Sequence, residues 1–318
     1  MVRPFRFIAP MPALRDSPGR WRDAVRRIEA LGFSTVAISD HLTRGWSMDP
    51  LVAMTAAAEA TDRLRVLSLV LSNDYRHPAI LHRAAAMIDV LSAGRLELGL
   101  GAGWMPADYE AVGLPFGSPA LRLERLEEAV RIIKALFGGE PVTVDGKHYR
   151  LAGLEGLPGP VQRPHPPILI GGGGKRVLSL AAREADIVGI HARLAGRELD
   201  AEAVADLAPE RIAEKVRWIA EAARAAGRDA DAIELQFSVY LCRIAGSSRS
   251  ATASVSSFAG LLGSDPDLVA RSPAVLVGSV DRCVELLEER RERFSLSYLN
   301  LGGDIEAVAP IVARLSGR

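Results

Sequence analysis

The chain has 318 residues, of which 48% are hydrophobic and 25% charged, and its 39 Lys and Arg side chains balance 39 Asp and Glu. A formal net charge of zero argues against nucleic acid as the main partner. The two cysteines, Cys242 and Cys283, are too few for a disulfide framework and lack metal-ligand spacing, so we expect a cytoplasmic protein without a metal site. The amino-terminal sequence lacks a signal-peptide core, and no apolar run predicts a membrane span.

Short apolar runs alternate along the chain with longer segments that have helical spacing. The runs predicted as strands are 5–9, 35–39, 65–73, 95–103, 167–172, 186–192, 233–242 and 296–303. The segments predicted as helices are 20–31, 50–61, 77–94, 121–137, 175–185, 209–226, 281–293 and 305–315. Eight strand–helix units without a break into halves predict an α/β protein, a (β/α)8 TIM barrel in one domain over 1–318, rather than an open doubly wound sheet.

Two connections are longer than one helix requires. After the fourth strand, Asp145–Gly146 is a turn signal within "EPVTVDGKHYRLAG", which predicts an inserted hairpin at about 140–152. Near the seventh strand, Ser- and Gly-rich sequence over about 246–273 predicts a mobile segment around a broken helix.

Polar and glycine residues follow most of the predicted strands. The reactive face of a (β/α)8 barrel lies at the carboxyl ends of its strands, so these residues are expected to share one rim. In chain order they are Asp40 and His41, then Ser72, Asn73 and Asp74, then the stretch 101–104, the glycines 171–174, His191 and the glycines 302–303.

Four glycines in a row, Gly171, Gly172, Gly173 and Gly174, separate the fifth predicted strand from a helix. Their backbone N–H groups lie at the positive end of the helix dipole, where an anion such as phosphate binds well. A plain tight turn explains the same residues equally well.

Several of the rim residues have a structural as well as a functional interpretation. His41 fits a capped turn residue nearly as well as a catalytic one, and Asp40 is placed to orient its ring by a hydrogen bond. Gly101 and Gly103 are equally explained by close passage of the fourth strand past a neighbour.

The aromatic residues have two readings as well. Trp46 and Trp104 suit rim packing, yet an apolar rim is also what a planar ring system needs. His77 and His82 flank the start of a helix and are expected at the surface.

The stretches at 37–42, 69–116, 122–137 and 161–190 make the chain resemble the bacterial luciferase-like flavin and deazaflavin oxidoreductases. The most specific of them contains "RHPAIL" and "DVLSAGRLELGLGAGW". Within the family the chain is most similar to members assigned to the 8-hydroxy-5-deazaflavin coenzyme, F420. The likeness is strong to about Ile190 and weak beyond it.

The resemblance implies a (β/α)8 barrel with the cofactor ring across the strand carboxyl ends and a non-proline cis peptide around Val70–Leu71 that backs the ring. It implies that Asp40 and His41 lie near the ring and the substrate. Because an imidazole can titrate near neutral pH, we take His41 as the catalytic residue, and we take Trp46, Trp104 and His191 at the rim as the substrate pocket. The residues that the resemblance assigns to the cofactor are Asp40, Val70, Leu71, Ser72, Asn73, Gly101, Ala102, Gly103 and Gly171 to Gly174, with Lys175 or Arg176 assisting at the phosphate.

The function implied is F420-dependent hydride transfer to or from a small organic substrate, with His41 handling the proton. FMN is the alternative cofactor, in a reduced-FMN-dependent monooxygenase, and a non-catalytic flavin carrier is a third reading. One departure bears on the substrate: sugar-phosphate dehydrogenases of the family have a glutamate where this chain has Trp104, which favours an apolar, planar or carbonyl-bearing compound. The family also implies a homodimer, formed through the helices after the second and third strands, with no membrane partner.

Overall fold

A computed structural model describes residues 3–15, 17–43, 45–46, 48–194 and 200–318. Its main sheet is nine-stranded, in the order β3-β2-β1-β13-β10-β9-β8-β5-β4, and β3 also pairs with β5, so the sheet closes on itself. Because β3 and β4 both pair with β5 and both come from the third predicted strand, the closed sheet corresponds to the eight expected strands. The predicted (β/α)8 barrel is therefore confirmed.

The chain divides into two compact units. The 37–171 unit comprises Met11–Arg26 and Ala37–Gly171, and the 172–318 unit comprises the chain up to Pro10, Arg27–Val36 and Gly172–Arg318. Three elements have residues in both units, namely α1 (Pro18–Ala30), β2 (Thr35–Ile38) and β8 (Ile168–Gly172).

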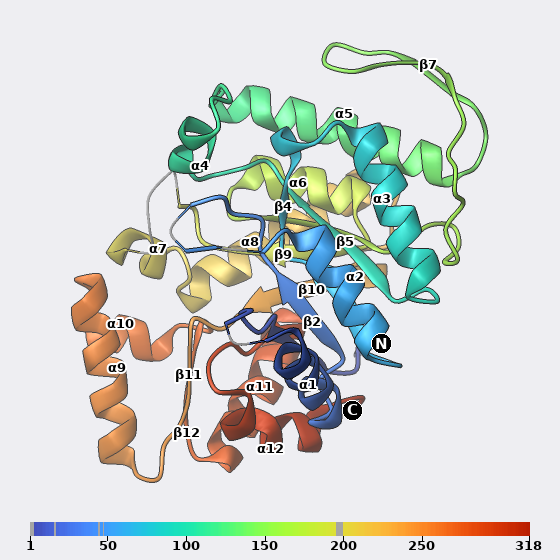
Figure 1. Cartoon of the computed structure of the whole chain (residues 1–318). Helices are drawn as coiled ribbons and strands as arrows, with labels where there is room; N and C mark the ends of the chain where they lie inside the picture. The colour runs from blue at the N-terminus through green and yellow to red at the C-terminus, as the bar shows by residue number, and fades with distance from the viewer. Residues whose placement is uncertain (1–2, 16, 44, 47, 195–199) are drawn as a thin grey trace. The chain divides into compact units, whose positions relative to one another are not determined.

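The 37–171 unit contains the strands and helices of the second to fourth barrel repeats. They are α2 (Pro50–Ala60), β3 (Arg65–Ser68), β4 (Leu71–Ser72), η1 (Asn73–Tyr75), α3 (Pro78–Leu91), β5 (Leu96–Gly101), α4 (Pro106–Ala111), α5 (Pro119–Phe137), β6 (Val142–Asp145), β7 (Arg150–Leu154) and most of β8 (Ile168–Gly172). Proline in the first turn starts α2, α3 and α5, as expected from its fixed φ and missing N–H. Helix α3 packs against α5 (Figure 1).

The third predicted strand is interrupted between β3 and β4. The Leu69–Val70 peptide is cis, one peptide earlier than the resemblance implied. Glycines in β5 leave room for this stretch: a Cβ on Gly99 would lie 1.8 Å from the carbonyl oxygen of Ser68, and one on Gly101 would lie 2.6 Å from a Val70 methyl. The packing reading of Gly101 is thus supported by a specific neighbour.

An antiparallel hairpin, β6 with β7, occupies the insertion after the fourth strand and extends beyond α5 (Figure 1). Glu128 of α5 holds its turn, since the carboxylate accepts hydrogen bonds from the backbone N–H of His148 at 3.0 Å and of Tyr149 at 2.9 Å. Gly146 passes so close to Glu128 that a Cβ would lie 1.8 Å from the carboxylate. The hairpin is therefore fixed to α5 at its tip.

The 172–318 unit contains the remaining repeats. Its elements are β1 (Arg6–Pro10), α6 (Lys175–Glu184), β9 (Ile187–Ile190), α7 (Ala201–Ala205), α8 (Pro209–Ala225), η2 (Ala230–Ala232), β10 (Glu234–Ser238), β11 (Leu241–Ile244), α9 (Ser248–Leu262), α10 (Pro266–Arg271), β12 (Val275–Gly278), α11 (Val280–Phe294), β13 (Leu296–Asn300) and α12 (Ile305–Leu315). In the main sheet β13 pairs in parallel with both β1 and β10.

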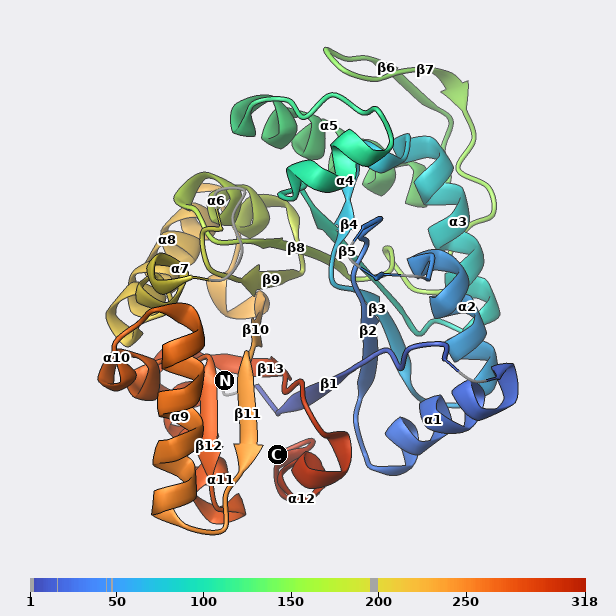
Figure 2. The same cartoon turned by 60° about the vertical axis from the view of Figure 1, so that its left-hand side comes forward.

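The prediction of a seventh strand over 233–242 is wrong at its carboxyl end. The strand stops at Ser238, and β11 pairs instead with β12, a strand that sequence patterning missed, in a separate two-stranded parallel sheet. Helix α9 packs on this small sheet (Figure 2). The broken helix expected at 246–273 consists of α9 and α10, which are separated by the left-handed Gly263.

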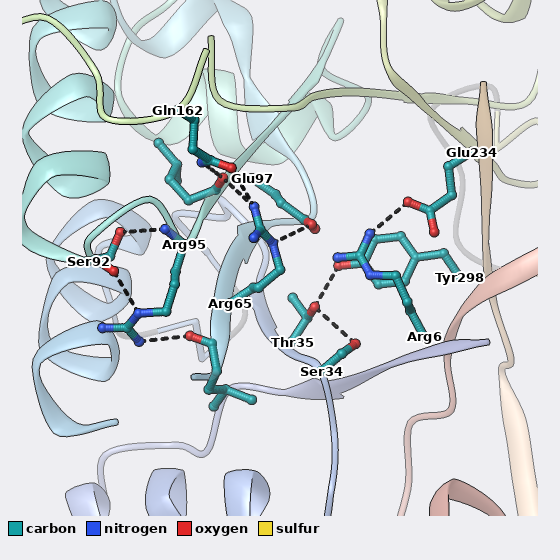
Figure 3. Close-up of polar contacts among 12 residues, drawn as sticks. Arg6, Ser34, Thr35, Arg65, Ser92, Arg95, Glu97, Gln162, Glu234 and Tyr298 are labelled. Carbon is teal, nitrogen blue, oxygen red and sulfur yellow. Dashed lines mark hydrogen bonds and ion pairs between the residues drawn. The ribbon is translucent and has the colours of Figure 1, made fainter. Parts of the chain in front are cut away.

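Ion pairs lie at the amino ends of strands in both units (Figure 3). In the 172–318 unit, Arg6 at the start of β1 pairs with Glu234 at the start of β10 at 2.7 Å. In the 37–171 unit, Arg65 at the start of β3 pairs with Glu97 of β5 at 2.7 Å. The guanidinium carbon of Arg6 lies over the Tyr298 ring, 4.0 Å from the ring centroid. These nearly buried carboxylates thus have close cationic partners.

Within the described residues, every helix is too short or too polar to cross a membrane.

Candidate active site

His41 and Asp108 form the central pair of the 37–171 unit. His41 follows β2, and Asp108 lies in the short helix α4 that follows β5. The distance between His41 Nδ1 and Asp108 Oδ2 is 2.7 Å, and the two side chains are 13% and 0% exposed. A buried carboxylate thus orients an imidazole that retains access to solvent.

The Asp108 carboxylate accepts three further hydrogen bonds from the turn after His41. Its Oδ1 accepts from the backbone N–H of Leu42 at 3.2 Å and of Thr43 at 3.0 Å, and from the Thr43 hydroxyl at 2.6 Å. Burial alone raises the pKa of Asp108, but the hydrogen bonds from Thr43, His41 and Leu42 hold that pKa below its ordinary value. Asp108 is therefore an anion, and its hydrogen-bond donors come from His41, Leu42 and Thr43.

Two tryptophans flank the His41 ring. The centroid distances are 5.1 Å to Trp46, which is 48% exposed, and 5.5 Å to Trp104, which meets the imidazole edge-on. The three residues predicted for catalysis and the substrate pocket within this unit are thus brought together. Their rings give His41 an apolar surround.

Asp40, the residue next to His41, has a different partner from the one expected. It is nearly buried and forms a two-point ion pair with Arg76, whose Nη2 lies 3.2 Å from Oδ1, and it accepts the Ser72 backbone N–H at 3.1 Å. The idea that Asp40 orients the His41 ring is therefore wrong, because Asp108 takes that place. Asp40 instead ties the end of β2 to the end of β4.

Ser72, Tyr109 and Asp74 form a buried polar chain behind the β5 glycines. The Tyr109 hydroxyl lies 3.2 Å from Ser72 Oγ and donates to Asp74 at 3.4 Å, and burial raises the pKa of Tyr109 to about 12. A Cβ on Gly103, where φ is +77°, would lie 1.9 Å from this hydroxyl. Gly103 is therefore required by packing as well as by backbone conformation.

The other predicted cofactor residue of this rim, Asn73, contacts the inserted hairpin. Its Nδ2 donates to the Tyr149 hydroxyl at 3.1 Å, and only 3% of the residue is exposed. Val70 and Leu71 belong to the stretch around the cis peptide, and Ala102 is half-buried between Gly101, the last residue of β5, and Gly103.

The glycine run forms the corner between β8 and α6, with Gly171 in the 37–171 unit and Gly172 to Gly174 in the 172–318 unit. Gly171 and Gly172 belong to β8, so only Gly173 and Gly174 make the turn. A Cβ on Gly172 would lie 2.3 Å from Val177, and one on Gly173 would lie 2.5 Å from the Ala192 carbonyl, whereas Gly174 has nothing within 4 Å. Packing thus explains two of the glycines, and Gly174 is left as the residue with open space.

Gly174 is the N-cap of α6 and offers no side-chain cap to the first-turn N–H groups. These N–H groups have no carbonyl partner within the helix, and Lys175 and Arg176 follow directly. The corner therefore has the donor set and charge that suit an anion.

His191, the last predicted pocket residue, lies in the same unit, just after β9. Burial and the Lys215 ammonium lower its pKa to about 4. Lys215 is fully buried; its Nζ donates to the His191 carbonyl at 2.7 Å and pairs with Asp206 at 2.6 Å. The neutral His191 thus lies at the end of a strand that a buried ion pair fixes.

Sequence reasoning missed Asp108, Arg76 and Tyr149, and it misplaced His82. His82 is 2% exposed, packs against Phe137 at a centroid distance of 4.8 Å and has a pKa lowered by burial to about 4. The surface prediction for His82 is therefore wrong. Across the described residues no group of three or more His, Cys, Asp or Glu side chains is arranged to hold a metal ion.

Solved structures share this fold across nearly the whole chain. The F420-dependent tetrahydromethanopterin reductase from Methanopyrus kandleri superposes with a TM-score of 0.75 at 20% identity, covering 98% of this chain and 97% of that one. This structural likeness supports the (β/α)8 barrel fold described above.

The chain belongs to the luciferase-like monooxygenase family, whose model matches residues 4–295. The F420-dependent glucose-6-phosphate dehydrogenase from Kineococcus radiotolerans is 34% identical over 54% of this chain and 51% of that protein. The FMNH2-dependent dimethylsulfone monooxygenase from Pseudomonas putida is 28% identical over 50% of this chain and 44% of its own. The matches thus span about half the length of these relatives. The family resemblance drawn from the sequence is confirmed.

Proposed function

We propose that the protein is a coenzyme F420-dependent oxidoreductase that transfers a hydride between the deazaflavin and a small organic substrate. The observation that carries the proposal is the His41–Asp108 pair beside Trp46 and Trp104. It supplies a solvent-accessible imidazole for proton transfer within an apolar surround. The similarity to F420-dependent dehydrogenases supports the choice of cofactor.

Each unit, taken by itself, has residues that suit one part of such a cofactor. In the 172–318 unit, the open space at Gly174, the uncapped first turn of α6 and the adjacent Lys175 suit its phosphate. In the 37–171 unit, Ser72 and Asn73 are the polar residues assigned to its ring and ribityl groups. When bound, the deazaflavin supplies a ring carbon that donates or accepts hydride.

The chain's own residues supply the proton and the selectivity. His41 presents Nε2, since its Nδ1 is engaged by Asp108, and we assign to Nε2 the proton exchanged with the substrate. The indoles of Trp46 and Trp104 favour an apolar, planar or carbonyl-bearing substrate. Trp104 takes the place of a carboxylate, so we do not propose a sugar phosphate, although a relative named above acts on one.

The second candidate is a reduced-FMN-dependent monooxygenase, which the similarity to the dimethylsulfone monooxygenase favours. Absorption spectra of the protein reconstituted with F420 or FMN, followed by oxygen-electrode measurements during turnover, separate the two. F420 binding with turnover that consumes no oxygen is expected. Tight FMN binding, no F420 binding and oxygen-consuming turnover would reverse the assignment.

A carrier that binds the cofactor without catalysis is the third candidate. A panel of ketones, enones and secondary alcohols offered to the F420-loaded protein tests it, with the deazaflavin absorbance as readout. Redox of the bound cofactor by any member of the panel excludes the carrier reading.

We also propose that the protein forms homodimers through α2 and α3. The solvent-facing side of α3 is apolar apart from Arg83, with Ile80 66%, Met87 46% and Leu91 43% exposed, and Val52 of α2 is 69% exposed. Apolar residues at this helical spacing are typical of a covered face.

A further inference from the structure

We propose that Asp108 is a positioning residue for proton transfer: its carboxylate fixes His41 in the Nδ1–H tautomer, so that Nε2 is the nitrogen that exchanges the proton. The inference rests on the proposed function for its kinetic consequence. The tautomer itself is a property of the protein without cofactor.

The two oxygens of Asp108 have separate tasks. Oδ1 accepts from two backbone N–H groups and the Thr43 hydroxyl, so it has no capacity left for the imidazole. Oδ2 accepts from His41 Nδ1 at 2.7 Å. Because every other partner of this carboxylate is a donor, the proton between Asp108 and His41 belongs to the ring nitrogen.

Burial makes the arrangement firm. The Asp108 side chain is 0% exposed, so water does not compete for Oδ2, and the His41 ring is held between the indoles of Trp46 and Trp104. An imidazole with Nδ1–H engaged by a buried carboxylate has its lone pair on Nε2. A free lone pair on Nε2 is what a general base needs, and a proton on Nε2 is what a general acid needs.

The competing explanation is that Asp108 only clamps the turn at 41–43. Two variants distinguish the roles. Asp108→Asn keeps an oxygen that accepts from the turn but replaces Oδ2 with an amide donor, which Nδ1–H cannot use. Thr43→Val removes one donor to Oδ1 and leaves the contact with the ring intact.

The first experiment is NMR of ¹⁵N-histidine-labelled protein without cofactor, with His41→Asn used to identify the His41 signals among the six histidines. We expect the Nδ1–H tautomer in the wild type and in Thr43→Val, and a switch to Nε2–H in Asp108→Asn. An Nε2–H tautomer in the wild type, or no switch in Asp108→Asn, would overturn the proposal.

The second experiment measures turnover of the F420-loaded protein with any substrate found active. We expect Asp108→Asn to lower kcat by about 100-fold with KM and the cofactor Kd changed less than about threefold. In the His41→Asn background the same change should cost less than about threefold, because Asp108 acts through His41. Independent, multiplicative losses would contradict the proposal. If no F420-dependent turnover exists, the proposed function fails while the tautomer measurement still decides the role of Asp108.

Discussion

The orientation of His41 depends on a residue 67 positions further along the chain. The neighbouring Asp40 was the obvious partner by sequence, but it is engaged by Arg76 and the Ser72 backbone. The sequence offered one signal for Asp108, namely a carboxylate one turn beyond Trp104 in "GWMPADY". Only the sheet, in which β3 pairs with both β2 and β5, brings that turn to His41, and pairing geometry is not contained in local sequence.

Replacing His41 with asparagine tests its catalytic role. We expect turnover to fall by about 100-fold or more, because general acid–base catalysis of this kind contributes about 10²–10⁴ in rate. The dissociation constant of F420, measured by fluorescence titration, should stay within about threefold. Loss of cofactor affinity with unchanged kcat would instead assign His41 to binding.

At the scale of elements, the glycines near strand ends are of two kinds. Some are packed closely against a neighbouring group, and others face open space. Gly99, Gly101 and Gly103 make room for neighbouring groups, whereas Gly174 faces nothing within 4 Å. Sequence alone left the two readings of each glycine open, because a glycine required by a neighbour and one required by a ligand have the same letter.

Alanine substitutions at the β8–α6 corner test this separation. Gly173→Ala should lower the free energy of unfolding by about 1–3 kcal/mol, because its methyl would meet the Ala192 carbonyl. Gly174→Ala is the matched control: it should keep stability within about 0.5 kcal/mol. If the corner binds the cofactor phosphate, Gly174→Ala should still weaken F420 binding in titration. Equal stability of both variants would show that the close approach at Gly173 is absent in solution.

Strand and helix periodicity predicted most elements of the barrel to within a few residues. It failed where the backbone changes course. The third predicted strand breaks at Leu69–Val70, and the seventh ends at Ser238 before β11 leaves for a second sheet. Each segment has the pattern of one uninterrupted strand in sequence, so hydrophobic patterning gives no sign of the break.

At the scale of the whole molecule, stability in acid should depend on His82 and His191, two histidines whose pKa is lowered. The pKa of His82 and that of His191 are each lowered to about 4, mainly by burial, against 6.5 in the unfolded chain. The unfolded state therefore binds more protons between these values, and stability is lost as the pH falls from about 6.5 to 4.

For His82, urea denaturation should show a loss of about 2 kcal/mol between pH 8 and pH 5, since one pKa unit corresponds to about 1.4 kcal/mol. His82→Leu should remove that part of the pH dependence and leave the part due to His191. An unchanged slope in the variant would mean that His82 is not buried in its neutral form.

Association of the whole protein should depend on the apolar face of α3. Met87→Glu places a charge in that face, and we expect analytical ultracentrifugation to show monomers where the wild type sediments as a dimer. Leu261→Glu on α9 is the control, because Leu261 is 82% exposed on a different helix. Dimers in Met87→Glu, or monomers in both variants, would remove the assignment of this face.

The ion pairs at the amino ends of the strands have a consequence for the evolution of new activities. Arg6 with Glu234, and Arg65 with Glu97, lie at the start of strands (Figure 3). In the 37–171 unit, His41 follows the end of β2 and Trp104 follows the end of β5. At β5, a residue that anchors the scaffold, Glu97, and a residue that would select a substrate, Trp104, thus lie toward opposite ends of one strand. A library that randomises only the turns carrying the tryptophans can therefore select for new substrates while the ion pairs that stabilise the strands are kept.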